Sequence, residues 1–166
     1  MKNKKKSMTR SIGIIGIGNP LRRDDGIGIL LLHHIKEKKE IFTQILTFVD
    51  GGTGGMNLIH LFNKFDVIIV LDAVDFNGTA GETRFFSIEE ITSRKQVSTV
   101  STHNEDVFKV ITLSKQIDEC PKEIFVFGVQ PQDVSFGQGL SDSIKKRFDV
   151  ITDNMERHIL HVLKNQ

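Results

Sequence analysis

Short apolar runs alternate along the chain with segments in which apolar residues recur every three or four positions. The first pattern is typical of buried strands and the second of amphipathic helices. The runs predict strands at residues 12–17, 44–49, 67–71, 83–86 and 123–127, and the longer periods predict helices at residues 26–38, 56–63, 103–116 and 141–163. Alternation of this kind favours parallel strand pairing with crossover helices. We therefore predict an α/β fold: a single-domain, three-layer α/β/α structure with a mostly parallel, roughly five-stranded twisted sheet and helices on both faces.

The last predicted helix has the clearest apolar stripe, which consists of Ile144, Phe148, Ile151, Met155, Ile159 and Val162. Ser141 precedes this stripe, and serine is a favourable residue at a helix N-terminus, so we expect it to cap the helix. Apolar periodicity is poor after the fourth predicted strand. We expect the stretch from Ser87 to Ser101 to be mobile.

The composition narrows the class of protein. The 166 residues fit one domain, which we place at residues 11–166 behind a basic, disordered tail at residues 1–10. Lysine and arginine number 22 against 21 acidic residues, a balance that disfavours nucleic acid as a partner. No segment approaches the ~18 apolar residues of a membrane span, and no large apolar stripe is left over, so we expect no membrane insertion and a monomer. The single cysteine, Cys120, excludes an internal disulfide and suits the cytoplasm, and we interpret it as an incidental thiol.

A glycine-rich loop follows the first predicted strand, and its sequence is Gly-Ile-Gly-Asn-Pro-Leu-Arg-Arg-Asp-Asp-Gly-Ile-Gly at residues 16–28. Gly16 and Gly18 permit tight turns, as in a phosphate-binding loop. Asp24 and Asp25, however, bring negative charge where a phosphate requires neutral or positive surroundings. Leu21 also stands where a dinucleotide fingerprint has its third glycine. The loop therefore favours a cation, with a nucleotide-binding module as an alternative.

Further acidic residues follow the other predicted strands. Asp50 ends the second strand, Asp72 ends the third, and Asp75 comes three residues later. Ligands bind at the carboxyl ends of strands in open parallel sheets, although such aspartates also close turns or cap helices. We interpret Asp75 as a turn residue and leave both readings open for Asp50 and Asp24. Asp72 is the hardest to explain structurally, because a carboxylate at the end of a fully apolar strand is costly to desolvate.

His103 begins a predicted helix that faces this edge, whereas the other histidines are expected on helix surfaces or in packing contacts: His33, His34, His60, His158 and His161. Two carboxylates and an imidazole are suitable ligands for a borderline divalent metal such as nickel or zinc. The spacing alone does not show that these side chains meet.

The motifs, taken in order, resemble those of the hydrogenase maturation endopeptidases, which process the large subunit of nickel-iron hydrogenases. The resemblance runs from Ile12 to the last helix, and its motifs are residues 16–28, Asp50-Gly-Gly-Thr-Gly-Gly-Met, Asp72-Ala-Val, Ser101-Thr-His, Gly128-Val-Gln-Pro and Gly139-Leu-Ser. It implies that Asp25, Asp72 and His103 bind nickel and carry out catalysis. Some members of the family have glutamate at the position of Asp25. Supporting roles in the loop fall to Gly16, Gly18, Asn19, Asp24 and Asp50.

The activity that this resemblance implies is an aspartic-type endopeptidase. It would remove the C-terminal extension of a hydrogenase large-subunit precursor once nickel has been inserted, with the nickel arriving in the substrate and not as a resident cofactor. Two mechanisms are compatible with the residues: nickel polarises the scissile carbonyl or a water while Asp25 or Asp72 accepts a proton, or nickel only positions the peptide and a free carboxylate is the base. A serine triad and a His-Glu-x-x-His segment are both lacking. A non-catalytic nickel-recognition or chaperone protein is the main alternative.

Overall fold

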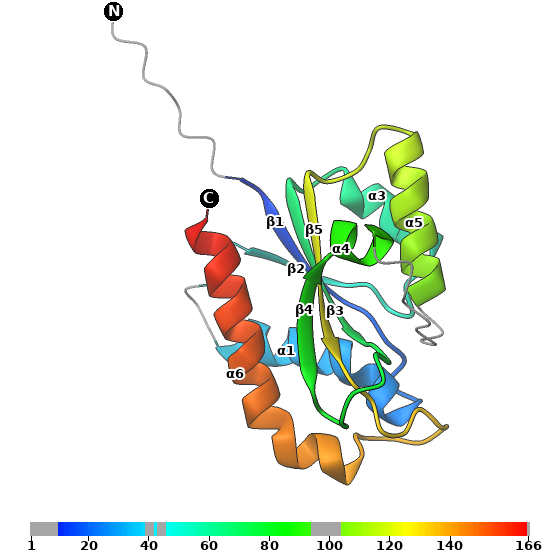
Figure 1. Cartoon of the computed structure of the whole chain (residues 1–166), viewed down its shortest axis with the longest axis vertical. Helices are drawn as coiled ribbons and strands as arrows, with labels where there is room; N and C mark the ends of the chain where they lie inside the picture. Colours follow the sequence, from blue (N-terminus) through cyan, green and yellow to red (C-terminus); the bar gives the residue numbers. More distant parts are fainter. Residues whose placement is uncertain (1–9, 39–41, 43–45, 94–103, 166) are drawn as a thin grey trace, which may run out of the picture.

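The computed structural model describes residues 10–38, 42, 46–93 and 104–165 and shows a twisted sheet with helices on both faces (Figure 1). The strands are β1 (Ile12–Gly16), β2 (Leu46–Asp50), β3 (Val67–Ala73), β4 (Thr83–Ser87) and β5 (Glu123–Val129). The helices are the 3₁₀ turns η1 (Arg23–Gly26) and η2 (Met56–Leu58), with α1 (Ile27–Lys38), α3 (Ile59–Phe62), α4 (Ile88–Ser93), α5 (Asn104–Gln116) and α6 (Asp142–Lys164). The predicted α/β/α architecture is confirmed.

The five strands lie in the order β2-β1-β3-β5-β4. All neighbours pair in parallel except β4, which is an antiparallel edge strand against β5. From β1 the chain moves first outward to β2 and then to β3 on the other side of β1. The strand order therefore reverses between β1 and β3, and ligands of open α/β sheets bind at such a point.

Side-chain alternation along the strands builds two hydrophobic cores. In β1, Ile12 and Ile14 belong to the core under α1 and α6, whereas Ile15 belongs to the core under η2, α3 and α5. All seven residues of β3 are buried, as expected for a central strand with helices on both sides. Figure 1 shows α1 and α6 on one face of the sheet and α3 and α5 on the other.

The predicted stripe of α6 faces the first core. Five of its residues are buried and Phe148 packs partly buried against the same cluster. The prediction that Ser141 caps this helix is correct in position but not in its hydrogen bond. Ser141 does occupy the N-terminal cap position of α6 in an extended conformation, but its hydroxyl makes no capping bond. It donates instead to Asp24, at 2.8 Å.

The expectation of a mobile stretch after β4 is wrong for its first part, which forms the helix α4. Ile88 is buried in the second core. The Ser87 N–H donates to the Glu90 carboxylate at 2.8 Å, and the Glu90 N–H donates to the Ser87 hydroxyl at 3.3 Å. This reciprocal pair is a capping box, a local signal that the periodicity argument overlooked. Residues 94–101 lie outside the described part of the chain.

The start of α1 packs directly on the point where the strand order reverses. A Cβ at Gly28 would lie 2.2 Å from the carbonyl oxygens of both Ile17 and Leu71, so only glycine allows this approach. The described residues include no helix that is both long and apolar enough to cross a membrane.

Candidate active site

The glycine-rich loop folds back over the end of β1 and so places Asp25 at the carboxyl edge of the sheet. Gly18 has a φ of +146°, and a Cβ at this position would lie 2.0 Å from the Asp25 carbonyl oxygen. The Asn19 N–H donates to Oδ2 of Asp25 at 3.2 Å. Asp25 is buried, with 3% of its surface exposed. The loop therefore holds this carboxylate close to the end of the first strand.

Between Ile17 and Asp25, the backbone of the same loop has no free N–H group for a phosphate. Each N–H from Ile17 to Asp25 donates to an acceptor within the protein, apart from Pro20, which has none. The acceptors come from β3, from the loop after β2, from the glycine-rich loop itself and from the loop between β5 and α6. A phosphate-binding loop requires several such donors to point at the ligand. The nucleotide-binding alternative therefore finds no support in this geometry.

Asp72 lies at the same edge of the sheet, one residue before the end of β3. It is 1% exposed, and it is opposite Gly128 of β5 in the parallel register. Strand alternation places it on the face of Ile68 and Val70, in the core that α5 covers. The residue before it, Leu71, pairs with Gly16 of β1. Asp72 is therefore a buried carboxylate at the point where the strand order reverses.

The structure thus places two of the three predicted ligands at the carboxyl edge of the sheet: Asp25 lies in η1, after the loop that follows β1, and Asp72 lies in β3. The third, His103, lies outside the described residues, directly before α5. Within the described ranges, no group of three or more histidine, cysteine, aspartate or glutamate side chains could hold a metal ion. The three-ligand set remains a prediction.

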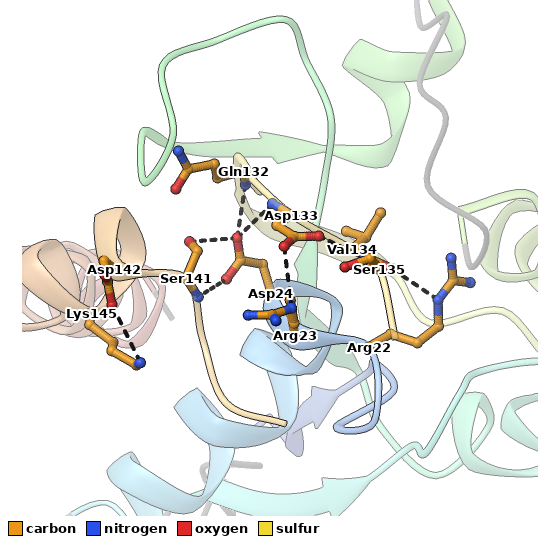
Figure 2. Close-up of polar contacts among 10 residues, drawn as sticks. All are labelled: Arg22, Arg23, Asp24, Gln132, Asp133, Val134, Ser135, Ser141, Asp142 and Lys145. Atoms are coloured by element: carbon orange, nitrogen blue, oxygen red, sulfur yellow. Dashed lines mark hydrogen bonds and ion pairs between the residues drawn. The ribbon is translucent and has the colours of Figure 1, made fainter. Parts of the chain in front are cut away.

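Asp24 is buried next to Asp25, and Figure 2 shows its carboxylate directed towards Gln132, Asp133 and Ser141. Its Oδ2 accepts the N–H groups of Gln132 and Asp133, both at 2.9 Å, and the Ser141 hydroxyl at 2.8 Å. Its Oδ1 accepts the Ser141 N–H at 2.7 Å. Asp24 therefore ties the glycine-rich loop to the loop of residues 130–141 and to the start of α6. This is the arrangement expected if Asp24 hydrogen-bonds the loop rather than binds a ligand.

The remaining aspartates at this edge close turns. Oδ1 of Asp50, an exposed residue, accepts the Gly52 N–H at 2.8 Å. Oδ1 of Asp75 accepts the Asn77 N–H at 2.9 Å, which confirms its predicted turn role. For Asp50, the hydrogen bond to Gly52 is the one expected of an aspartate that closes a turn.

Gln130 was not predicted as a functional residue, although it organises this edge. It is 7% exposed, its Oε1 accepts the N–H groups of Phe76 and Gly78 at 2.9 and 3.0 Å, and its Nε2 donates to Asp75 at 3.1 Å. It therefore holds the loop that follows Asp72. A glutamine directly after the apolar strand β5 was the available signal, because residues at that place lie at the carboxyl edge of the sheet.

Asp133 is a poor candidate for a base. The Ser135 hydroxyl and N–H donate to its carboxylate, and Arg23 lies 3.2 Å away, so the pKa of Asp133 is below its ordinary value.

Of the five histidines expected in surface or packing positions, three are exposed and two pack against phenylalanine rings, as predicted. Burial against Phe85 lowers the pKa of His158. Asp25 and Asp72 remain the carboxylates best placed for chemistry.

The fold and this acidic edge define the class: a three-layer α/β protein with buried aspartates where the strand order reverses. A family model described as hydrogenase maturation protease matches residues 29–158. The chain belongs to the hydrogenase maturation protease family.

Individual relatives agree with this assignment. The hydrogenase expression/formation protein HupD of Thiocapsa roseopersicina is 30% identical over 135 residues, which are 81% of this chain and 61% of HupD. The chain thus spans less than two thirds of that relative. The hydrogenase 2 maturation protease of Escherichia coli (strain K12) is 26% identical, with 80% of each protein covered. The structure of the hydrogenase maturating endopeptidase HybD from E. coli superposes with a TM-score of 0.78 at 21% identity, covering 92% of this chain and 93% of HybD, and it shows the same fold.

Proposed function

We propose that this protein is an endopeptidase that removes the C-terminal extension of a nickel-iron hydrogenase large-subunit precursor after nickel insertion. Membership of the maturation protease family supports this activity. The observation that carries the proposal is the burial of Asp25 and Asp72, 3% and 1% exposed, at the carboxyl edge of the sheet. Carboxylates in such a place are suited both to binding a substrate-borne cation and to accepting a proton.

Each residue at the edge has a distinct role in this proposal. Asp25 and Asp72 bind the nickel that the precursor carries, and His103 adds an imidazole nitrogen. One of the two carboxylates accepts the proton of the attacking water, while the metal either polarises the carbonyl or orients the peptide. Asp24 has a structural role in this scheme, because its hydrogen bonds hold it against Gln132, Asp133 and Ser141.

Nickel is part of the substrate in this scheme. Three oxygen and nitrogen ligands leave the coordination of nickel incomplete, whereas nickel already held by the precursor can accept them as additional or replacement ligands. The purified protein should therefore contain far less than one nickel per chain, measured by elemental analysis. One tightly held nickel per chain after purification would indicate a resident cofactor instead.

A measurement of precursor mass distinguishes an endopeptidase from a non-catalytic nickel chaperone. Nickel-loaded and nickel-free precursor are incubated with the protein, and the precursor mass is followed. We expect only the loaded form to lose its C-terminal extension. An unchanged mass in both samples, with binding of the loaded precursor retained, would favour the chaperone.

We further infer that the protein acts in the cytoplasm as a monomer. One cysteine, Cys120, suits a reducing compartment. Sedimentation equilibrium of the purified chain tests the second part of this inference, and a concentration-independent dimer mass would contradict it.

A further inference from the structure

Three apolar side chains near the candidate site are exposed, and we call them the loop patch: Leu21, Val134 and Phe136. Their exposed fractions are 61%, 39% and 82%. Leu21 belongs to the glycine-rich loop, and the other two belong to the loop between β5 and α6. None of them contributes to either hydrophobic core. The fold itself therefore does not account for these residues being apolar.

The loop patch is held by specific bonds between the two loops. The Gly137 N–H donates to the Leu21 carbonyl at 2.9 Å, and Nε of Arg22 donates to the Val134 carbonyl at 3.1 Å. The Arg22 guanidinium carbon lies 5.6 Å from the centre of the Phe136 ring. Figure 2 shows the Arg22 to Val134 bond beside the Asp24 junction. An exposed apolar surface on a braced backbone loses little conformational freedom on binding, which favours affinity.

Arg22 gives the patch a charge preference. Among the described residues it forms no ion pair with a carboxylate, and its polar contact is to the Val134 carbonyl. Its guanidinium therefore offers donors to an incoming carboxylate, next to the face of an aromatic ring. The surface suits a segment in which an apolar side chain is followed or preceded by an acidic one.

The position of the patch connects it to the candidate site. Leu21 and Arg22 stand four and three residues before Asp25 in the same loop. The Asp24 bonds hold the loop that carries Phe136 against this segment. A peptide bound on the patch is thus next to the loop that positions the candidate catalytic carboxylate.

We propose that the loop patch docks the hydrogenase large-subunit precursor, through an apolar side chain flanked by a carboxylate near the bond that is cut. This inference rests on the proposed function, because it names the surface by which the same site receives its substrate. Phe136 supplies the apolar contact and Arg22 the charged one.

The test compares Phe136→Ala with Ile117→Ala as a matched control. Ile117 is also an exposed apolar residue, at 47%, but it follows α5 at the amino edge of the sheet, near the start of β5. With nickel-loaded precursor, we expect Phe136→Ala to raise KM about tenfold and to leave kcat within about twofold, as for an aromatic anchor of an interface. The control should leave both unchanged. Arg22→Gln should raise KM as well and weaken its dependence on salt.

Binding of nickel-free precursor to the protein gives a readout that does not need catalysis, because we expect only the nickel-loaded form to be cleaved. Adding Phe136→Ala to this protein should raise Kd about tenfold. If the wild type cleaves the precursor and Phe136→Ala changes neither KM nor Kd, the docking proposal is wrong and the proposed function stands. If Phe136→Ala weakens binding but the wild type does not cleave, docking stands and the peptidase assignment is wrong.

Discussion

Asp24 and Asp25 are adjacent and equally buried, but they belong to different parts of the molecule. Asp24 accepts four hydrogen bonds from a segment more than 100 residues away. Asp25 accepts the Asn19 N–H within its own loop and lies at the same edge of the sheet as Asp72, which is one residue before the end of β3. Burial and residue type are the same at both positions. The comparison teaches that burial and residue type do not by themselves distinguish a carboxylate that ties two distant segments together from one at the edge of the candidate site.

The largest expected effect is on activity at the carboxyl edge. Asp25→Asn and Asp72→Asn should each slow precursor processing by at least about a hundredfold, because the amide neither accepts a proton readily nor binds nickel as a carboxylate does. Single-turnover assays with nickel-loaded precursor measure this loss. Circular dichroism should show a folded protein in both cases. If both variants processed the precursor at the wild-type rate, Asp25 would have no catalytic role that distinguishes it from Asp24.

The second effect is on stability at the loop junction. Asp24→Asn should lower the free energy of unfolding by about 3 kcal/mol, because the amide nitrogen would face N–H donors that now bind a carboxylate oxygen. Urea unfolding measures the change. Asp50→Asn is the matched control, because it alters an exposed turn contact and should cost less than about 1 kcal/mol.

One result would contradict the assignment of a structural role to Asp24 and a catalytic role to Asp25. A fully folded Asp24→Asn protein that had lost as much activity as Asp25→Asn would mean that Asp24 itself takes part in the chemistry. We expect instead that Asp24→Asn protein, assayed where it is still folded, retains most of its processing rate.

The smallest effect concerns a third aspartate, which has several donors but is only partly buried. Asp66 accepts the Ser11 N–H and hydroxyl, both at 3.0 Å, and Lys122 at 2.9 Å. These bonds, led by that of Lys122, lower the pKa of Asp66 from 3.8 to about 2. Because the pKa is lower in the folded state, the stabilisation is present above pH 3.8 and is lost as the pH falls towards 2.

Asp66→Asn should therefore reduce the loss of stability in this acidic range and change the stability at neutral pH less than Asp24→Asn does. Thermal unfolding across the range, with wild type alongside, measures the difference. A larger loss at neutral pH than in Asp24→Asn would show that the number of donors matters more than burial.

Local pattern alone predicted much of the fold. The apolar runs of β1 and β3 and the stripe of α6 record burial within each element, since side chains repeat every two residues in a strand and about every 3.6 in a helix. Short elements were harder. The helix α4 depends on the Ser87–Glu90 capping box and one buried residue, Ile88, and contributes too little periodicity to be recognised.

By itself the sequence determined the elements, the placing of acidic residues at strand ends and the family motifs around Asp25 and Asp72. Only the tertiary structure decided that the hydroxyl of Ser141 serves Asp24 rather than α6, and that Leu21 is joined to the loop of Phe136. The physical reason is that periodicity reports which side of an element is buried, not which distant segment covers it. That choice follows from strand order and from the hydrogen bonds that the two loops satisfy in each other.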